Sequence, residues 1–160
     1  VDDSFQKTLA AYYISGLEDN LKRASKNAYN IGVPFIWCSN NLLTSLITQG
    51  ILYENMTGDK SYHQFLVEQR DWLFGRNPWG TSTLTKREVA GGLVDGPVYA
   101  SIFNSLKGLR MDNPDEFETF QNKFVVYHDD IGDYSTNEPT MDGTAGSIIM
   151  MAHWANQDKN

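Results

Sequence analysis

Residues 125–142 concentrate side chains that could carry acid–base chemistry. This window contains no lysine or arginine, and it holds five acidic residues, Asp129, Asp130, Asp133, Glu138 and Asp142, a quarter of the 20 in the chain. Because like charges this close repel, we expect at least one carboxyl pKa in the window to rise. A carboxyl that keeps its proton near neutral pH is what a general acid needs.

Aromatic residues accompany the acids. Tyr127 and Tyr134 flank them, and Trp79 lies in a glycine- and proline-rich loop. Flat aromatic faces stack well on sugar rings, so all three are candidate substrate contacts, although Trp79 is equally well explained as a core residue. The three histidines show no metal-ligand spacing, and only His128, beside Asp129, is placed near the candidate site.

Three interpretations of the acidic window remain open from the residues alone: a carboxylate active site, a solvated surface loop and a calcium site. Calcium favours clustered carboxylates, but the twelve-residue helix–loop–helix pattern is absent. A structural role is also open for Glu138, because Pro139 favours the first turn of a helix and a helix N-terminus stabilises an anion. We predict no metal ligand and no cofactor.

Length and composition restrict the function classes. A chain of 160 residues is one domain in size, and its 41% hydrophobic residues suffice for a core. A net charge of −7 argues against nucleic acid and anionic membrane as partners. The single cysteine, Cys38, excludes an internal disulfide. No apolar run reaches the length that a membrane helix needs. The chain begins with Val1 and has neither an initiator Met nor a signal peptide, so we expect that an upstream segment was removed.

The hydrophobic periodicity predicts an all-α fold with unusually long loops. Apolar spacing and helix-ending signals predict helices over residues 3–26, 40–58, 60–74, 114–126 and 139–156, with a short helix within 98–106. The last helix is expected to turn Ala145, Ile148, Ile149 and Ala152 inward. Residues 81–85 form the one candidate strand. Long ordered loops in a compact helical protein are usually functional.

At the acidic window the sequence resembles the C-terminal active-site signature of family 9 glycoside hydrolases, the cellulase or endoglucanase family. The matching residues are Tyr127, His128, Asp129, Tyr134, Glu138, Thr140 and Ala145. The signature's Asp falls on Asp129 and its Glu on Glu138, with Tyr134 at the aromatic position between them. One departure is Thr144, where the signature has Asn.

Three further segments resemble the same family in the same order, so the resemblance covers most of the chain from about residue 30. They are Trp37-Cys38-Ser39-Asn40, Phe74-Gly75-Arg76-Asn77-Pro78-Trp79-Gly80-Thr81-Ser82 and Gly92-Leu93-Val94-Asp95-Gly96-Pro97. Between the last two segments the family usually carries a longer loop with a His- and Arg-bearing substrate motif. Here only residues 84–90 join them, and that motif's role is not transferred to Lys86 or Arg87.

The resemblance implies an (α/α)6 barrel and inverting hydrolysis of β-1,4-glucan. It assigns the general acid to Glu138 and a second, site-shaping carboxylate to Asp129. An inverting enzyme needs a separate base. The family's base belongs to an N-terminal Asp-Ala-Gly-Asp motif, which this sequence lacks. We therefore interpret residues 1–160 as a partial catalytic domain, the C-terminal half of the barrel, and predict no turnover by the isolated chain.

A half-barrel leaves apolar helix faces uncovered, so we expect the missing N-terminal half of the barrel or a homo-oligomer as partner, besides the glucan. A polymeric substrate and the resemblance imply a secreted or periplasmic location. Two other function classes remain: a non-catalytic carbohydrate-binding or scaffolding module, and a helical interaction domain whose acidic loop binds a cation.

Overall fold

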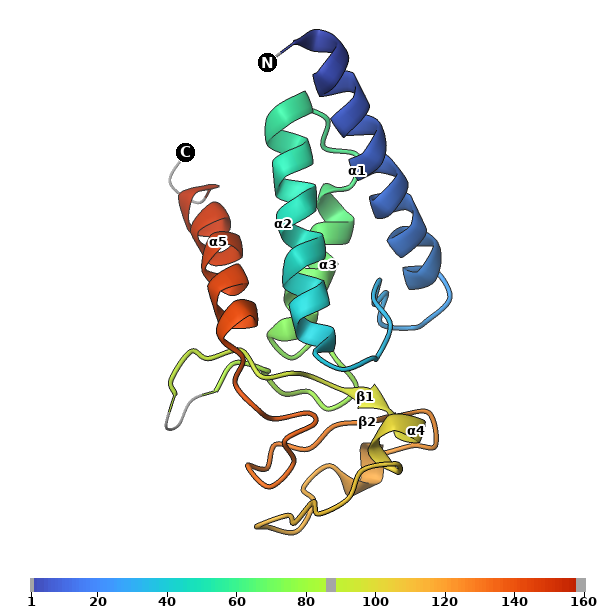
Figure 1. Ribbon diagram of the computed structural model, residues 1–160, viewed down its shortest axis with the longest axis vertical. Helices are drawn as coiled ribbons and strands as arrows, with labels where there is room; N and C mark the ends of the chain where they lie inside the picture. Colours follow the sequence, from blue (N-terminus) through green and yellow to red (C-terminus); the bar gives the residue numbers. More distant parts are fainter. Residues whose placement is uncertain (1, 86–88, 158–160) are drawn as a thin grey trace.

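The computed structural model describes residues 2–85 and 89–157, and over this range the fold is all-α with long loops, as predicted. The long helices gather at one end of the molecule and the loops at the other (Figure 1). The helices and strands are α1 (Asp3–Ala24), α2 (Ser39–Thr57), α3 (His63–Leu73), β1 (Val98–Tyr99), α4 (Ala100–Phe103), a 3-10 turn η1 (Glu118–Phe120), β2 (Val125–Val126) and α5 (Met141–Gln157).

Local side-chain chemistry sets the ends of the first three helices. The Asp2 carboxylate caps α1 by accepting the Ser4 N–H at 3.1 Å. Gly58 ends α2 in the left-handed conformation, with φ at 75°. Helix α3 begins at His63, later than predicted, because Asp59 accepts the Ser61 N–H and forms a local turn instead of a helix cap.

Helix α2 is the centre of the core, packed against α1, α3 and α5. The fully buried apolar side chains from these helices form one cluster, which includes Leu17, Leu43, Ile47, Leu66, Trp72, Leu73 and Met150. Such burial is the main favourable term in folding, at roughly 25 cal/mol per Å² of apolar surface. This cluster holds the start of α2 in place, next to the loops that carry the candidate site.

Helix α5 packs on the opposite face from the one predicted. Ile148 is 64% exposed and Ile149 53% exposed, and Ala145 and Ala152 are exposed as well. The helix instead turns Gly143, Ser147 and Met150 toward α2. A side chain at Gly143 would meet Asn41, and one at Gly146 would meet Thr44, so small residues are what let the two helices approach.

The prediction of a helix over residues 114–126 is wrong. Only the short turn η1 forms there, and the chain then extends into β2, which pairs antiparallel with β1. The Asp115 carboxylate accepts the Phe117 N–H, and the Asn122 amide oxygen accepts the N–H groups of Phe124 and Val125. These local bonds compete with a helix for the backbone donors. The predicted strand over 81–85 is reduced to one bridge between Leu84 and Leu93.

Apolar side chains remain exposed on the outer faces of the helical end. They include Phe5 and Tyr12 of α1, Leu52 of α2, and Ile148 and Ile149 of α5. Exposed apolar area on this scale usually marks a surface that another body covers. In the described part of the chain, no helix combines the length and apolar character needed to cross a membrane.

Candidate active site

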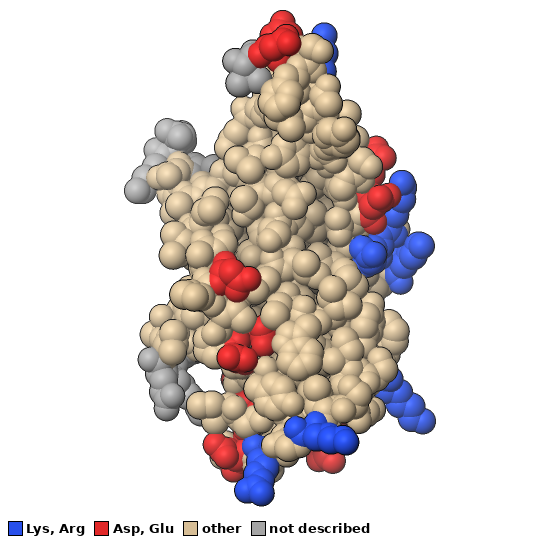
Figure 2. Space-filling view, in the orientation of Figure 1, with Lys and Arg blue, Asp and Glu red and all other residues tan. Residues whose placement is uncertain are grey.

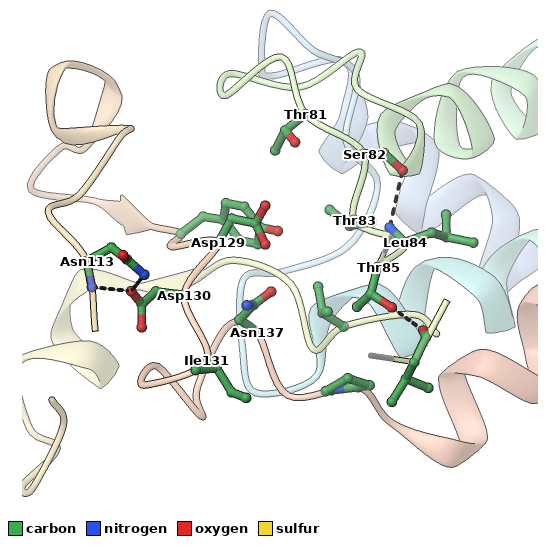
Figure 3. Close-up of a pocket in the computed structure, with 14 residues that line it drawn as sticks. Thr81, Ser82, Thr83, Leu84, Thr85, Asn113, Asp129, Asp130, Ile131 and Asn137 are labelled. Carbon is green, nitrogen blue, oxygen red and sulfur yellow. Dashed lines mark hydrogen bonds between the residues drawn. The ribbon is translucent and has the colours of Figure 1, made fainter. Parts of the chain in front are cut away.

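A cleft of about 400 Å³ opens at the loop end of the molecule. Hydroxyl groups from residues 81–83 and 85 lie on one side, and Asp129, Asp130, Asn113 and Asn137 lie on the other (Figure 3). The remaining lining is largely apolar and includes Leu84, Val94 and Ile131. A concave surface with a few convergent polar groups is the usual form of a small-molecule site.

Residues 93–96 join the two sides of the cleft. The Val94 N–H donates to the Thr83 carbonyl at 3.1 Å on one side. On the other side, the Asp95 N–H donates to the Glu138 carbonyl at 3.0 Å and the Thr140 N–H donates to the Leu93 carbonyl at 2.9 Å. The glycine-rich segment that the sequence singles out is therefore the backbone support of both walls.

Asn137 connects Asp129 to the position next to Glu138. With its amide oriented to satisfy both neighbours, Nδ2 of Asn137 donates to Oδ1 of Asp129 at 3.3 Å and its oxygen accepts the Asp130 N–H at 3.1 Å. Asp129 is exposed and lines the cleft. The two signature carboxylates thus belong to one hydrogen-bonded loop, with Asp129 turned into the cleft.

Glu138 is exposed and lies between Asn137 and Pro139, which both line the cleft, but Glu138 is not itself one of the lining residues. Helix α5 begins only at Met141, and among the described residues no backbone N–H of α5 donates to the Glu138 carboxylate. The alternative interpretation of Glu138 as a structural cap of α5 is therefore not supported. The charge of Glu138 contributes to raising the pKa of two nearby groups, the Asp95 carboxyl and the Cys38 thiol.

The carboxyl with the raised pKa is Asp95, which lies outside the predicted window. Burial raises the pKa of Asp95 to about 6, and the charges of Glu138, Asp142 and Asp133 act in the same direction. Sequence reasoning missed this residue. The signal that could have found it is a carboxylate within the apolar, glycine-rich segment Gly91-Gly92-Leu93-Val94-Asp95-Gly96-Pro97.

Like-charge repulsion does not raise the pKa of Asp130 or Asp133. Both carboxylates instead accept hydrogen bonds that stabilise the loop. Burial alone would raise the pKa of Asp130, but the N–H groups of Asp112, Gly132 and Asn113 that donate to it outweigh burial and hold the pKa below its usual value. Asp133 is likewise buried, and donors from His128, Ser135 and Thr136 lower its pKa.

His128 lies beside Asp129, and the two ring nitrogens of His128 approach other acidic residues. Its Nδ1 lies 2.7 Å from Asp133 Oδ2, and its Nε2 lies 3.5 Å from Asp115 Oδ2. The ring also packs on Phe103, with 5.0 Å between ring centroids. His128 therefore connects the loop around Asp115 to the loop that carries the signature acids.

Two of the three predicted sugar contacts are core residues. Trp79 is buried against Trp72 and Tyr127, so the core interpretation of this residue is the one the structure supports. Tyr127 borders the cleft but is only 1% exposed, and its ring packs between Trp79 and Phe117. Neither ring offers an open face on which a sugar could stack.

Tyr134 is the predicted aromatic residue that stays exposed. Its ring stacks on Trp37, with 6.2 Å between centroids and 28° between the ring planes. Both rings are more than a third exposed. Trp37 was not selected as a sugar contact from the sequence, although it begins one of the four segments that carry the family resemblance.

The remaining signature residues fasten the walls of the site. Thr144, which replaces the signature's Asn, accepts the Leu93 N–H at 3.0 Å and donates to the Thr140 carbonyl at 2.6 Å. Asn77 of the Asn-Pro segment donates to the carbonyls of Trp72 and Thr81 and accepts the Trp79 N–H. Both residues therefore have positional roles in this chain.

The net charge of the chain is −7. On the face shown in Figure 2, acidic groups are spread over the surface, and basic groups lie along one edge and at the lower end. Within residues 2–85 and 89–157, no group of three or more His, Cys, Asp or Glu side chains is arranged to hold a metal ion. Lys86 and Arg87, in the short connection before Gly91, lie outside the described residues.

Comparison with solved structures supports the fold. The family 9 endoglucanase J30 matches with a TM-score of 0.73 and 22% identity over 97% of this chain and 32% of its own. A metagenome-derived family 9 endoglucanase matches with a TM-score of 0.72 and 19% identity over 96% of this chain and 30% of its own. A thermostable endoglucanase mutant from Alicyclobacillus acidocaldarius matches with a TM-score of 0.67 and 20% identity, over 96% and 32% of the two chains.

The chain thus spans about a third of the length of these structures. Its helices and loops have the fold of the C-terminal part of an (α/α)6 barrel. No curated protein sequence matches the chain. The sequence model described as glycosyl hydrolase family 9 matches residues 2–151, nearly the whole chain. This chain therefore belongs to glycosyl hydrolase family 9.

Proposed function

We propose that the chain is the acid-bearing part of an inverting glycoside hydrolase that cleaves β-1,4-glucan. The observation that carries this proposal is the cleft of about 400 Å³, which has hydroxyl groups on one wall and Asp129 on the other, with Glu138 next in the chain to the lining residues Asn137 and Pro139. Hydroxyl and carboxylate groups are suitable partners for sugar hydroxyls. Family membership and the endoglucanase matches support the reaction class.

In this mechanism Glu138 donates a proton to the glycosidic oxygen as the bond to the anomeric carbon breaks. A water molecule attacks the anomeric carbon from the opposite face, activated by a base that inverting enzymes hold about 6.5–9.5 Å from the acid. Asp129, held by Asn137, shapes the cleft and orients the sugar. The stacked pair of Trp37 and Tyr134 supplies an exposed aromatic surface for a sugar ring.

We propose that the base comes from the family's Asp-Ala-Gly-Asp motif on a second body that covers the exposed faces of α1 and α5. This body is the N-terminal half of the barrel, whether on the same polypeptide or on another chain. The isolated 160-residue chain should then show no turnover. A polymeric substrate also favours action outside the cytoplasm, in a secreted or periplasmic location.

Co-expression with the upstream coding region, followed by a reducing-sugar assay on a soluble β-glucan, tests the proposal. Glu138→Gln should abolish activity of the assembled enzyme, and Glu118→Gln, on the turn η1, should not. Turnover by the 160-residue chain alone that disappears with Glu138→Gln would contradict the assignment of the base to a second body. Oligosaccharide binding with no gain of activity on assembly would instead favour a carbohydrate-binding module.

A further inference from the structure

We propose that Asp95 is a positioning residue for Glu138, with its buried carboxyl set opposite the acid so that the two cannot readily both be charged. This inference rests on the proposed function of Glu138 as proton donor. It adds a residue that the signature motif does not contain. The argument begins from the backbone pairing of the two segments.

The pairing places Asp95 and Glu138 directly opposite each other. Val94 and Pro139 form an antiparallel bridge, and the next pair along the two segments is Asp95 with Glu138. The Asp95 N–H donates to the Glu138 carbonyl at 3.0 Å, which fixes this register. Opposed residues of an antiparallel pair project their side chains on the same face, with Cβ atoms roughly 4.5–5.5 Å apart. The two carboxyls therefore share one face.

Asp95 is held tightly against the start of α2. Its carbonyl accepts the Asn40 N–H at 2.9 Å, and Nδ2 of Asn40 donates to the Val94 carbonyl at 2.9 Å. At Gly96, where φ is 87°, a Cβ atom would lie 2.4 Å from the Asn40 side chain. Asn40, at the start of α2, therefore hydrogen-bonds to the backbone carbonyls of both Val94 and Asp95. These bonds would have to break for the Asp95 segment to move its carboxyl into solvent.

The Asp95 carboxyl is unusual because it is buried with one oxygen unused. The residue is 1% exposed, and its Oδ1 has no hydrogen-bond partner among the described residues. An unsatisfied buried acceptor is costly, at about 1–3 kcal/mol. A purely structural role would not require a carboxylate in this position. A bound proton relieves part of the cost, which connects the burial of Asp95 to the protonation state of its neighbours.

The groups that act on Asp95 come from several elements. Burial is the largest of the influences that together raise its pKa to about 6. The carboxylates of Glu138, Asp142 and Asp133 act in the same direction as burial, and a hydrogen bond with the Cys38 thiol opposes them. Electrostatic coupling between two acids is reciprocal. A charge on either of the two facing carboxyls therefore opposes a charge on the other.

The coupling can be measured at Asp95 in the isolated chain, without any activity. Side-chain carboxyl carbons of the aspartates are followed by ¹³C NMR from pH 3 to pH 9. Asp95 should titrate with a midpoint about pH 6. Glu138→Gln removes a facing negative charge and should lower this midpoint. The control Asp19→Asn, on the exposed side of α1 beside Lys22, should leave it in place. An Asp95 midpoint that Glu138→Gln does not move would overturn the proposal.

The consequence for catalysis is measured on the enzyme assembled with its upstream region. Asp95→Asn should shift the alkaline limb of the kcat/KM pH profile to lower pH, whereas a merely structural residue would lower activity at every pH alike. An unshifted limb overturns the positioning role, provided that Glu138→Gln is inactive. If Glu138→Gln keeps full activity, the proposed function fails instead, and the NMR result still decides the coupling. Should Asp95→Asn not fold, the Glu138→Gln titration remains decisive.

Discussion

Nδ1 of His128 and Oδ2 of Asp133 lie 2.7 Å apart, and both residues are buried. The same carboxylate oxygen accepts the Thr136 hydroxyl at 2.8 Å, and the His128 N–H donates to that hydroxyl oxygen at 3.1 Å. The loop between His128 and Thr136 is thus closed on itself just before Glu138. This closure fixes where the proposed acid emerges from the loop.

Replacing His128 should open this loop. In His128→Gln, the buried Asp133 carboxylate loses a short hydrogen bond, so we expect the free energy of unfolding to fall by about 1.5–3 kcal/mol. Urea unfolding at pH 7 measures the loss. His63→Gln, which removes the more exposed pair with Glu54, is the matched control and should cost less. A loss for His128→Gln no larger than for the control would contradict the closure argument.

Asp95 should make the chain less stable as pH rises. Its pKa in the folded chain, about 6, lies above the unfolded value of 3.8, so the stability it contributes is fully present below pH about 4 and is lost as pH rises through 6. By linkage the full loss is about 3 kcal/mol. Asp95→Asn should therefore gain stability over the wild type at pH 7.5 but not at pH 4.5, as measured by urea unfolding. An equal difference at both pH values would count against the buried, titrating carboxyl.

Gly132 should tolerate no side chain. A Cβ atom there would lie 1.7 Å from the Arg110 carbonyl oxygen, a backbone atom that cannot move aside without shifting its segment. We expect Gly132→Ala to destabilise the chain by about 1–3 kcal/mol. Gly16→Ala, within α1 and 3.9 Å from its nearest neighbour, should instead stabilise it by about 0.5–1 kcal/mol. Thermal unfolding of the two variants should move in opposite directions, and a harmless Gly132→Ala would show that the two loop segments do not touch.

The isolated chain should self-associate through its exposed apolar faces. Ile148 and Ile149 lie side by side on the outer surface of α5. Replacing both with Asn should reduce the sedimentation coefficient at high protein concentration and should also weaken assembly with the upstream half of the barrel. Thr8→Asn, at an exposed position on α1, is the control and should change neither. A wild-type chain that stays monomeric at all concentrations would contradict the covered-face interpretation.

Helix positions followed from the sequence because long apolar periodicities dominate them. The stripes of α1, α2 and α3 predicted that these helices exist, and Gly58 predicted the end of α2, although α3 begins later than predicted. The face of α5 did not follow from hydrophobicity, since Gly143 and Gly146 allow α2 to approach on the opposite side. Whether small residues can pack closely depends on the shape of the partner helix. The hydrophobic pattern of one helix carries no information about that partner.

The short elements of the site could not be predicted from periodicity. Strands β1 and β2 have two residues each, too few for an alternating pattern. The loop before β2 depends on the side chains of Asp115 and Asn122, which bind nearby backbone and displace the expected helix. Asp95 was missed for a related reason, because only the tertiary structure buries it beneath Asn40 and the Glu138 segment.

The contact between Gly96 and Asn40 joins the rigid helical core to the chemistry at the loops. Because no other residue type fits at position 96, the first turn of α2 and the two segments beneath it must move as one body. A substitution near the beginning of α2 should therefore change the position of Glu138 even where the substituted residue does not line the cleft. Efforts to change the pH dependence of the proposed activity could start from this junction and leave every residue that lines the cleft in place.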